Sequence, residues 1–172
     1  NTEREDLMFG RDLYGMTDRE PRSLAVLGRS WNNPPELELH SESFTSEGYD
    51  KNQRAYLLSH AGTGEPGPLT FTIRADEDAP VVNLAFVVTN WGDRGARLTL
   101  DEQPVPEGKA FRVGYRRTLE GVDLVAWVKT ESRMPVKVSM TPGARAASAF
   151  TASIHSKRRD HETPDIHVAG GV

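Results

Sequence analysis

Hydrophobic and polar residues alternate with a period of two along much of the chain between about residues 69 and 154. The segment LTFTI (69–73) shows this pattern, and residues 96–100 and 136–140 repeat it. Successive side chains of a β-strand point to opposite faces, so each segment is predicted to be a strand with one buried and one solvated face. Several such strands at short spacing predict an all-β fold, an antiparallel β-sandwich of the immunoglobulin-like or jelly-roll type.

About nine strands are expected in this sandwich. Residues 81–89 (VVNLAFVVT) are nearly all apolar, which is typical of a central strand covered on both faces. Residues 41–52 are expected to form a loop. The two strands at 111–116 and 122–129 form the clearest hairpin, with Glu120-Gly121 as its turn. The remaining strands are predicted at 36–39, 53–60, 69–75, 96–100, 135–141 and 148–155.

The two ends of the chain are more polar and lack this alternation. Residues 1–34 are predicted to be an N-terminal arm, or a linker from a preceding domain, followed by a sandwich domain at 35–156 and a mobile tail at 157–172. From Pro21, the residues Leu24, Leu27 and Trp31 follow helical spacing, although a short strand at 24–27 is the alternative.

Composition excludes several function classes. The net charge is −4, which argues against a nucleic-acid partner bound through overall charge. The chain contains no cysteine, so a disulfide framework, a thiolate zinc site and a cysteine nucleophile are all excluded. No apolar run approaches the roughly 20 residues that span a bilayer, so no membrane partner is expected.

Aromatic residues provide the first candidate site, since a flat ring can cover the apolar face of a sugar. Tyr49 lies in a polar loop and Trp91 in a turn, positions compatible with exposure, whereas packing at the rim of the sandwich is the favoured interpretation of Trp91. Trp127 lies within a strand, on the same face as Val125, and is assigned to the core.

A basic strand provides the second candidate site. Arg112 and Arg116 share one face of their strand, and Gly114 between them leaves room for a flat ligand. Guanidinium groups bind carboxylates and sulfates in a forked geometry, so an acidic polysaccharide would fit, with Tyr115 as a further ligand-binding residue. The alternative is a solvated outer face whose arginines pair with the nearby acidic residues Glu120 and Asp123.

Metal and cofactor chemistry has weaker signals. Acidic residues gather in the turn 76–78 and again at Glu47 and Asp50, which leaves Ca²⁺ as a low-ranking alternative to no cofactor at all. No metal-ligand spacing occurs, and three histidines lie in the tail. His40 and His60 lie at strand ends, and neither has a nucleophile or carboxylate at a sequence spacing that indicates catalysis. No catalytic residue is therefore assigned.

Four segments resemble a type of β-sandwich module found at the C-terminal end of large bacterial proteins, often ones that act on polysaccharides. They are SWNNPPELEL (30–39), SEGYDKNQRAY (46–56), PVVNLAFVVTNWG (80–92) and FRVGYRRTLEGVDLVAWVK (111–129). The resemblance covers about two thirds of the chain and contains no active-site motif. It implies an accessory module in a secreted or periplasmic protein, with residues 1–30 leading in from an upstream catalytic domain.

The leading hypothesis is therefore a non-catalytic accessory domain of a larger carbohydrate-active protein, with a polysaccharide and a catalytic domain or partner chain as its partners. The first alternative is a structural or protein-interaction module. The second is a small polysaccharide lyase or hydrolase, in which His60 or Tyr115 would act as a base beside Arg112.

Overall fold

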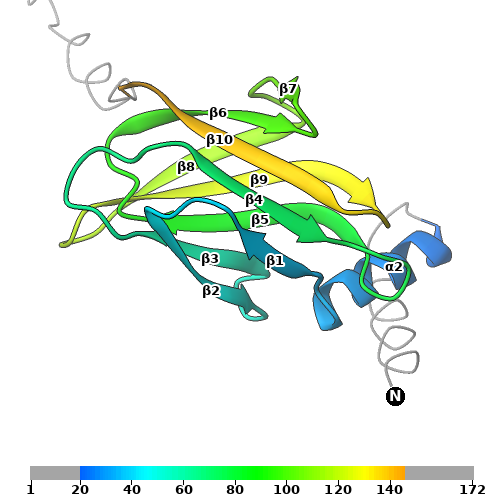
Figure 1. Ribbon diagram of the computed structural model, residues 1–172. Helices are drawn as coiled ribbons and strands as arrows, with labels where there is room; N and C mark the ends of the chain where they lie inside the picture. The colour runs from blue at the N-terminus through cyan, green and yellow to red at the C-terminus, as the bar shows by residue number, and fades with distance from the viewer. Residues whose placement is uncertain (1–19, 146–172) are drawn as a thin grey trace, which may run out of the picture.

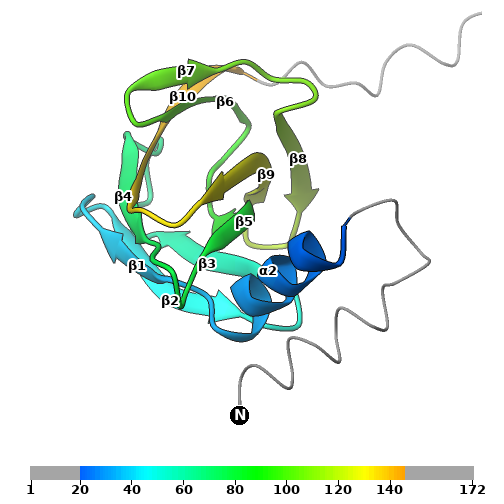
Figure 2. The same cartoon turned by 90° about the vertical axis from the view of Figure 1, so that its right-hand side faces the viewer.

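Two five-stranded sheets pack face to face in the computed structural model, which describes residues 20–145 (Figures 1 and 2). The first sheet has the strand order β1-β4-β10-β6-β7, and the second has the order β2-β3-β5-β9-β8. The elements are α2 (Pro21–Asn32), β1 (Glu36–Leu39), β2 (Phe44–Asp50), β3 (Ala55–His60), β4 (Leu69–Arg74), β5 (Val81–Thr89), β6 (Arg94–Leu100), β7 (Gln103–Val105), β8 (Phe111–Arg117), β9 (Val122–Ser132) and β10 (Val136–Arg145).

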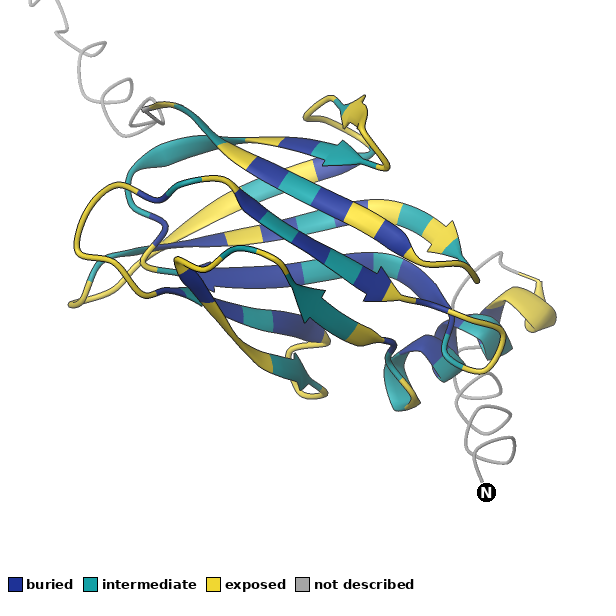
Figure 3. Cartoon of the chain, viewed as in Figure 1, coloured by how far each residue is buried: buried dark blue, intermediate teal, exposed yellow. Residues whose placement is uncertain are grey.

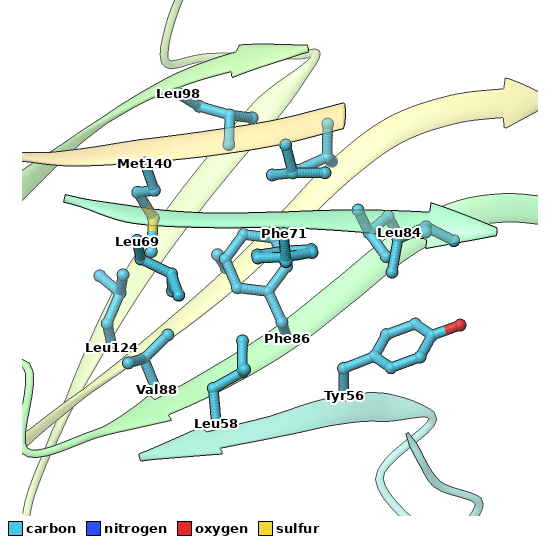
Figure 4. Close-up of a cluster of buried hydrophobic side chains, with 14 of the residues drawn as sticks. Tyr56, Leu58, Leu69, Phe71, Leu84, Phe86, Val88, Leu98, Leu124 and Met140 are labelled. Atoms are coloured by element: carbon cyan, nitrogen blue, oxygen red, sulfur yellow. The ribbon is translucent and has the colours of Figure 1, made fainter. Parts of the chain in front are cut away.

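The predicted all-β sandwich is confirmed, and the residue alternation explains its core. Buried and exposed positions alternate along the strands (Figure 3). The inward side chains of the two sheets interlock in one hydrophobic cluster (Figure 4). Phe71 of β4 meets Phe86 of β5 edge-on, with 5.5 Å between the ring centroids, an arrangement that aromatic pairs prefer.

Two features of the sheets differ from the sequence prediction. The expected loop 41–52 contains the edge strand β2, whose pairing with β3 includes a register shift between Ser46 and Gly48. Phe44 is its one buried residue, so the backbone ladder forms there without an alternating pattern. The sandwich is also not purely antiparallel, because β3 pairs with β5 in parallel.

The hairpin of β8 and β9 is confirmed, and so is the central position of β5. The last paired residues of the hairpin are Arg117 and Val122, so its loop is 118–121 rather than a two-residue turn. In that loop the Thr118 hydroxyl accepts from the backbone N–H groups of Glu120 and Gly121. The strand expected at 148–155 and the tail at 157–172 lie outside the described residues.

The described part of the expected N-terminal arm folds as the helix α2, at one end of the sandwich beside β5 (Figure 1). Pro21 occupies the first turn, where its missing N–H has no intrahelical partner to lose. Leu24 and Leu27 are buried. Polar contacts hold the C-terminal end, because Arg29 donates to the Glu77 carbonyl at 3.2 Å and Asn33 donates to the Asp78 carbonyl at 3.0 Å.

Candidate functional site

The outer face of the second sheet brings together charged, aromatic and small residues at the β8–β9 edge. Alternation along β8 and β9 buries Phe111, Leu124 and Val128 in the core, so their strand neighbours face outward. Three cross-strand pairs form this outward surface: Arg112 with Trp127, Gly114 with Val125, and Arg116 with Asp123. Directly opposite side chains on neighbouring strands lie close enough to interact.

Arg112 and Trp127 form the first of these pairs. The guanidinium carbon of Arg112 lies over the indole, 5.3 Å from a ring centroid. A cation above an aromatic face is attracted by the negative π surface, and the planar guanidinium keeps its N–H edge available to another group. Among residues 20–145, Arg112 has no carboxylate partner. The ring therefore positions a cation whose hydrogen-bonding edge is unoccupied by protein carboxylates.

Next to this cation the surface is open and apolar. A Cβ placed on Gly114 would meet nothing within 4 Å. Val125, its cross-strand partner, is 41% exposed, which is unusual for a large apolar residue in the middle of a strand. Gly114 and Val125 thus leave a flat shelf beside Arg112.

A second cation lies on the same face. Lys129 follows Trp127 by two positions along β9, is exposed, and has no acidic partner in the described part of the chain. It is a diagonal cross-strand neighbour of Arg112, and long side chains in such positions lie within reach of one another. We call Arg112, Gly114, Val125, Trp127 and Lys129 the β8–β9 face.

Arg116 forms an ion pair within the protein, as the alternative interpretation of the basic strand predicts. Its Nε and one terminal nitrogen both donate to Asp123 Oδ2, at 3.1 and 3.0 Å. Asp123 is buried and also accepts from the Asn90 backbone N–H at 3.3 Å. The neighbouring Arg117 is paired with Asp93 at 3.2 Å. Neither guanidinium offers the unoccupied edge that Arg112 does.

Trp91 lies in the core, in line with its interpretation as a packed residue, and its assignment as an accessible ligand-binding residue is wrong. Its side chain is 0% exposed, and its ring packs near that of Phe44. Left-handed backbone conformations at Asn90 and Gly92 turn the chain so that the indole points inward, where its N–H donates to the Arg94 carbonyl at 3.1 Å. This ring has no free face for a sugar.

The two tyrosines assigned as ligand-binding residues lie away from Arg112. Tyr49 is on the opposite edge strand of the second sheet, half-buried and edge-on to Tyr56 at 5.0 Å, and burial raises the pKa of Tyr49 to about 12. Tyr115 is paired with the core residue Leu124, so it faces the inner side of β8, and partial burial raises its pKa. Of the five assigned residues, the structure brings Arg112 and Arg116 onto one face.

Trp127 and Lys129 are the members of this face that sequence reasoning did not assign to it. The interpretation of Trp127 as a core residue is wrong, because Leu124, Ala126 and Val128 fill the inner side of β9. Since β9 is apolar on both sides over this stretch, the alternation alone does not tell which side is buried. The charged residue Lys129, in phase with Trp127, was the signal that this side faces outward.

The described residues contain no group of three or more acidic or histidine side chains arranged to hold a metal ion. In the acidic turn considered for Ca²⁺, Asp76 accepts from the backbone N–H groups of Asp78 and Ala79, and Glu77 pairs with Arg133 at 2.8 Å. His60 is buried against Phe44, on a strand well separated from β8 in the sheet order.

No protein-family model matches this chain, and no match to it was found among curated proteins or among solved structures. In the part of the chain that the structure describes, no helix is both long and apolar enough to span a membrane.

Proposed function

We propose that this chain is a non-catalytic β-sandwich domain that binds an acidic polysaccharide and serves as an accessory to a carbohydrate-active catalytic domain. The observation that carries the proposal is the placement of Arg112, which is held over Trp127 without a carboxylate partner among the described residues. A polymer ligand of this kind would place the protein in a secreted or periplasmic setting.

An acidic ligand suits the face better than a neutral one. Trp91 is buried and the Trp127 ring is covered on one side by Arg112, so this face presents a guanidinium edge rather than a bare aromatic ring. A guanidinium edge matches a carboxylate, with two parallel N–H···O bonds. Lys129, which is exposed and two residues after Trp127 on β9, adds a second positive charge to this face. These features favour a carboxylate-bearing sugar such as a uronate.

The shape of the face suits a chain-like ligand. The shelf over Gly114 and Val125 is part of the sheet surface rather than an enclosed cavity, which suits an extended ligand. A lyase would need a general base next to Arg112. Neither candidate base among residues 20–145 fits, because His60 and Tyr115 do not share the face of Arg112. Binding without catalysis is therefore the simpler proposal.

Affinity electrophoresis tests this function directly, with polygalacturonate or alginate in one gel and a neutral glucan in another. The protein should be retarded by an acidic polymer, and Arg112→Ala should weaken that binding by at least about tenfold, since a charge-assisted hydrogen bond contributes about 1.5–3 kcal/mol. Arg117→Ala is the matched control, because Arg117 is already paired with Asp93. Equal retardation by the neutral polymer, or no effect of Arg112→Ala, would contradict the proposal.

A protein-interaction module is the second candidate, and one observation favours it. Leu57, Val87 and Val125 are registered partners on three neighbouring strands and form an apolar row across the outer face of the second sheet. Val125 is the exposed member of this row, Leu57 is half-buried and Val87 is buried, and an exposed apolar residue beside Trp and Arg is common at protein interfaces. Sedimentation velocity separates the two candidates, because a row that needs a protein cover should cause self-association that Val125→Glu relieves. A monodisperse monomer counts against this candidate.

A further inference from the structure

The outer face of the first sheet carries a polar groove that is separate from the β8–β9 face. Three hydroxyl residues form its floor on neighbouring strands, because Ser139 of β10 is the registered partner of both Thr70 in β4 and Thr99 in β6. The hydroxyls of Thr70 and Ser139 are 3.4 Å apart. Glu102 and Lys137 complete the lining of this groove, whose volume is about 350 Å³.

The position of Glu102 is conformationally costly. Asp101 and Glu102 form the two-residue turn between β6 and β7, since Leu100 pairs with Gln103. Both have positive φ angles, 46° and 69°. A turn of this type favours Asn-Gly or Asp-Gly, because a side chain in the left-handed region is strained. Glu102 therefore occupies a backbone conformation that its side chain disfavours, and strain of this kind is concentrated at functional sites.

Two hydrogen bonds connect this turn to Lys137 of β10, which lines the groove. The Asp101 backbone N–H donates to the Lys137 carbonyl at 2.8 Å, and the Lys137 N–H donates to Asp101 Oδ1 at 2.8 Å. In the turn held by these two hydrogen bonds, the Glu102 carboxylate lies 3.6 Å from the Lys137 ammonium. Both side chains are largely exposed, so this ion pair is weak and a ligand can enter it at little cost.

We propose that this groove is a second carbohydrate site, specific for a neutral sugar. A carboxylate accepts hydrogen bonds from two adjacent hydroxyls, an ammonium donates to sugar oxygens, and hydroxyl side chains do both. The charges of Glu102 and Lys137 cancel, so the lining favours neither an anionic nor a cationic ligand. The proposal goes beyond the acidic site and does not depend on it, because no residue is shared between the two.

The test uses cellohexaose, mannohexaose and xylohexaose as neutral probes, with backbone amide shifts followed by NMR. At least one probe at millimolar concentration should shift the amides of Thr99, Lys137 and Ser139. Glu102→Gly should abolish these shifts or weaken binding at least tenfold, while raising Tm by about 2–4 °C through relief of the turn strain. Arg112→Ala should leave the neutral binding unchanged, which separates this site from the acidic one.

Thr99→Val provides a second variant that keeps the shape and strand preference of the residue while removing its hydroxyl. It should also weaken binding, with the fold intact. Three results would overturn the proposal: no probe shifts the three amides, Glu102→Gly binds as the native protein does, or Glu102→Gly lowers Tm and so shows that the glutamate is there to stabilise the turn.

Discussion

The Arg112 guanidinium lies over the Trp127 indole, with 5.3 Å between its carbon and a ring centroid, because the two residues are registered partners on β8 and β9. Packing against the indole holds the long, flexible Arg112 side chain, and with it the positive charge, in one position. Arg116, two residues further along β8, is instead held by the buried Asp123. The two arginines share a face but have different roles, and the proposed acidic site depends on the first.

Replacing Trp127 tests whether the ring positions Arg112. Trp127→Leu should weaken binding to an acidic polysaccharide by about fivefold, because a cation–π contact of this kind contributes about 1 kcal/mol. Trp127→Phe, which keeps an aromatic face, should retain most of the affinity. Isothermal titration with an oligouronate gives both values. If Trp127→Leu binds as tightly as the native protein, the ring has no part in positioning the cation.

Trp91 should instead determine stability. Trp91→Ala removes a fully buried ring and leaves its space unfilled, which should cost about 3–5 kcal/mol of unfolding free energy. Urea unfolding followed by circular dichroism measures this loss. Affinity for polysaccharide, measured on the fraction that stays folded, should be unchanged. A stable Trp91→Ala protein that has lost binding would mean that the ring is accessible to ligand.

The helix α2 should behave as part of the folded domain rather than as a linker. Leu24→Ala should cost about 2–5 kcal/mol of unfolding free energy, since Leu24 lies on the buried side of α2 and is 1% exposed. Leu119→Ala is the control, because Leu119 is fully exposed in the β8–β9 loop and its truncation should change stability by less than about 0.5 kcal/mol. Similar urea midpoints for the two variants would contradict this assignment of α2.

Asp50 should give the β2–β3 turn a dependence on acid. A side-chain hydrogen bond from Gln53, followed by backbone N–H groups of Gln53 and Asn52, lowers the pKa of Asp50. A lowered pKa in the folded state stabilises the protein above the ordinary value of about 3.9, and that contribution is lost as the pH falls through the lower value.

The Asp50 prediction is checked by carboxyl carbon chemical shifts and by stability at several pH values. The difference in stability between the native protein and Asp50→Asn should shrink as the pH falls below the ordinary pKa of an aspartate. A difference that stays constant, or a titration of Asp50 at its ordinary pKa, would show that the three donors do not favour the charged form.

Alternation predicted the strands well wherever one face was apolar and the other polar, as at 69–73 in β4. It failed for β2, in which one residue is buried and backbone pairing with β3 maintains the strand. It also gave no direction for Trp127, because β9 is apolar on both faces over that stretch. A strand's pattern shows that two faces differ, but the packing of the whole sandwich decides which one is inside.

The candidate site was harder to predict than the fold, for two physical reasons. The inward direction of Trp91 depends on left-handed backbone conformations at Asn90 and Gly92, which a turn-forming sequence permits but does not require. The engagement of Arg116 by Asp123 depends on the register of β8 against β9. Arg112 was assigned correctly to an outward face, whereas its contact with Trp127 follows from that same register.

The most direct test of the acidic site follows two indole N–H signals by NMR while an oligogalacturonate is added. The Trp127 indole signal and the Arg112 Nε–H signal should shift together with one binding curve, whereas the signal of the buried Trp91 should stay in place. A neutral oligosaccharide should leave the Trp127 signal unmoved. If the oligogalacturonate moves neither Trp127 nor Arg112, the β8–β9 face is not an acidic polysaccharide site.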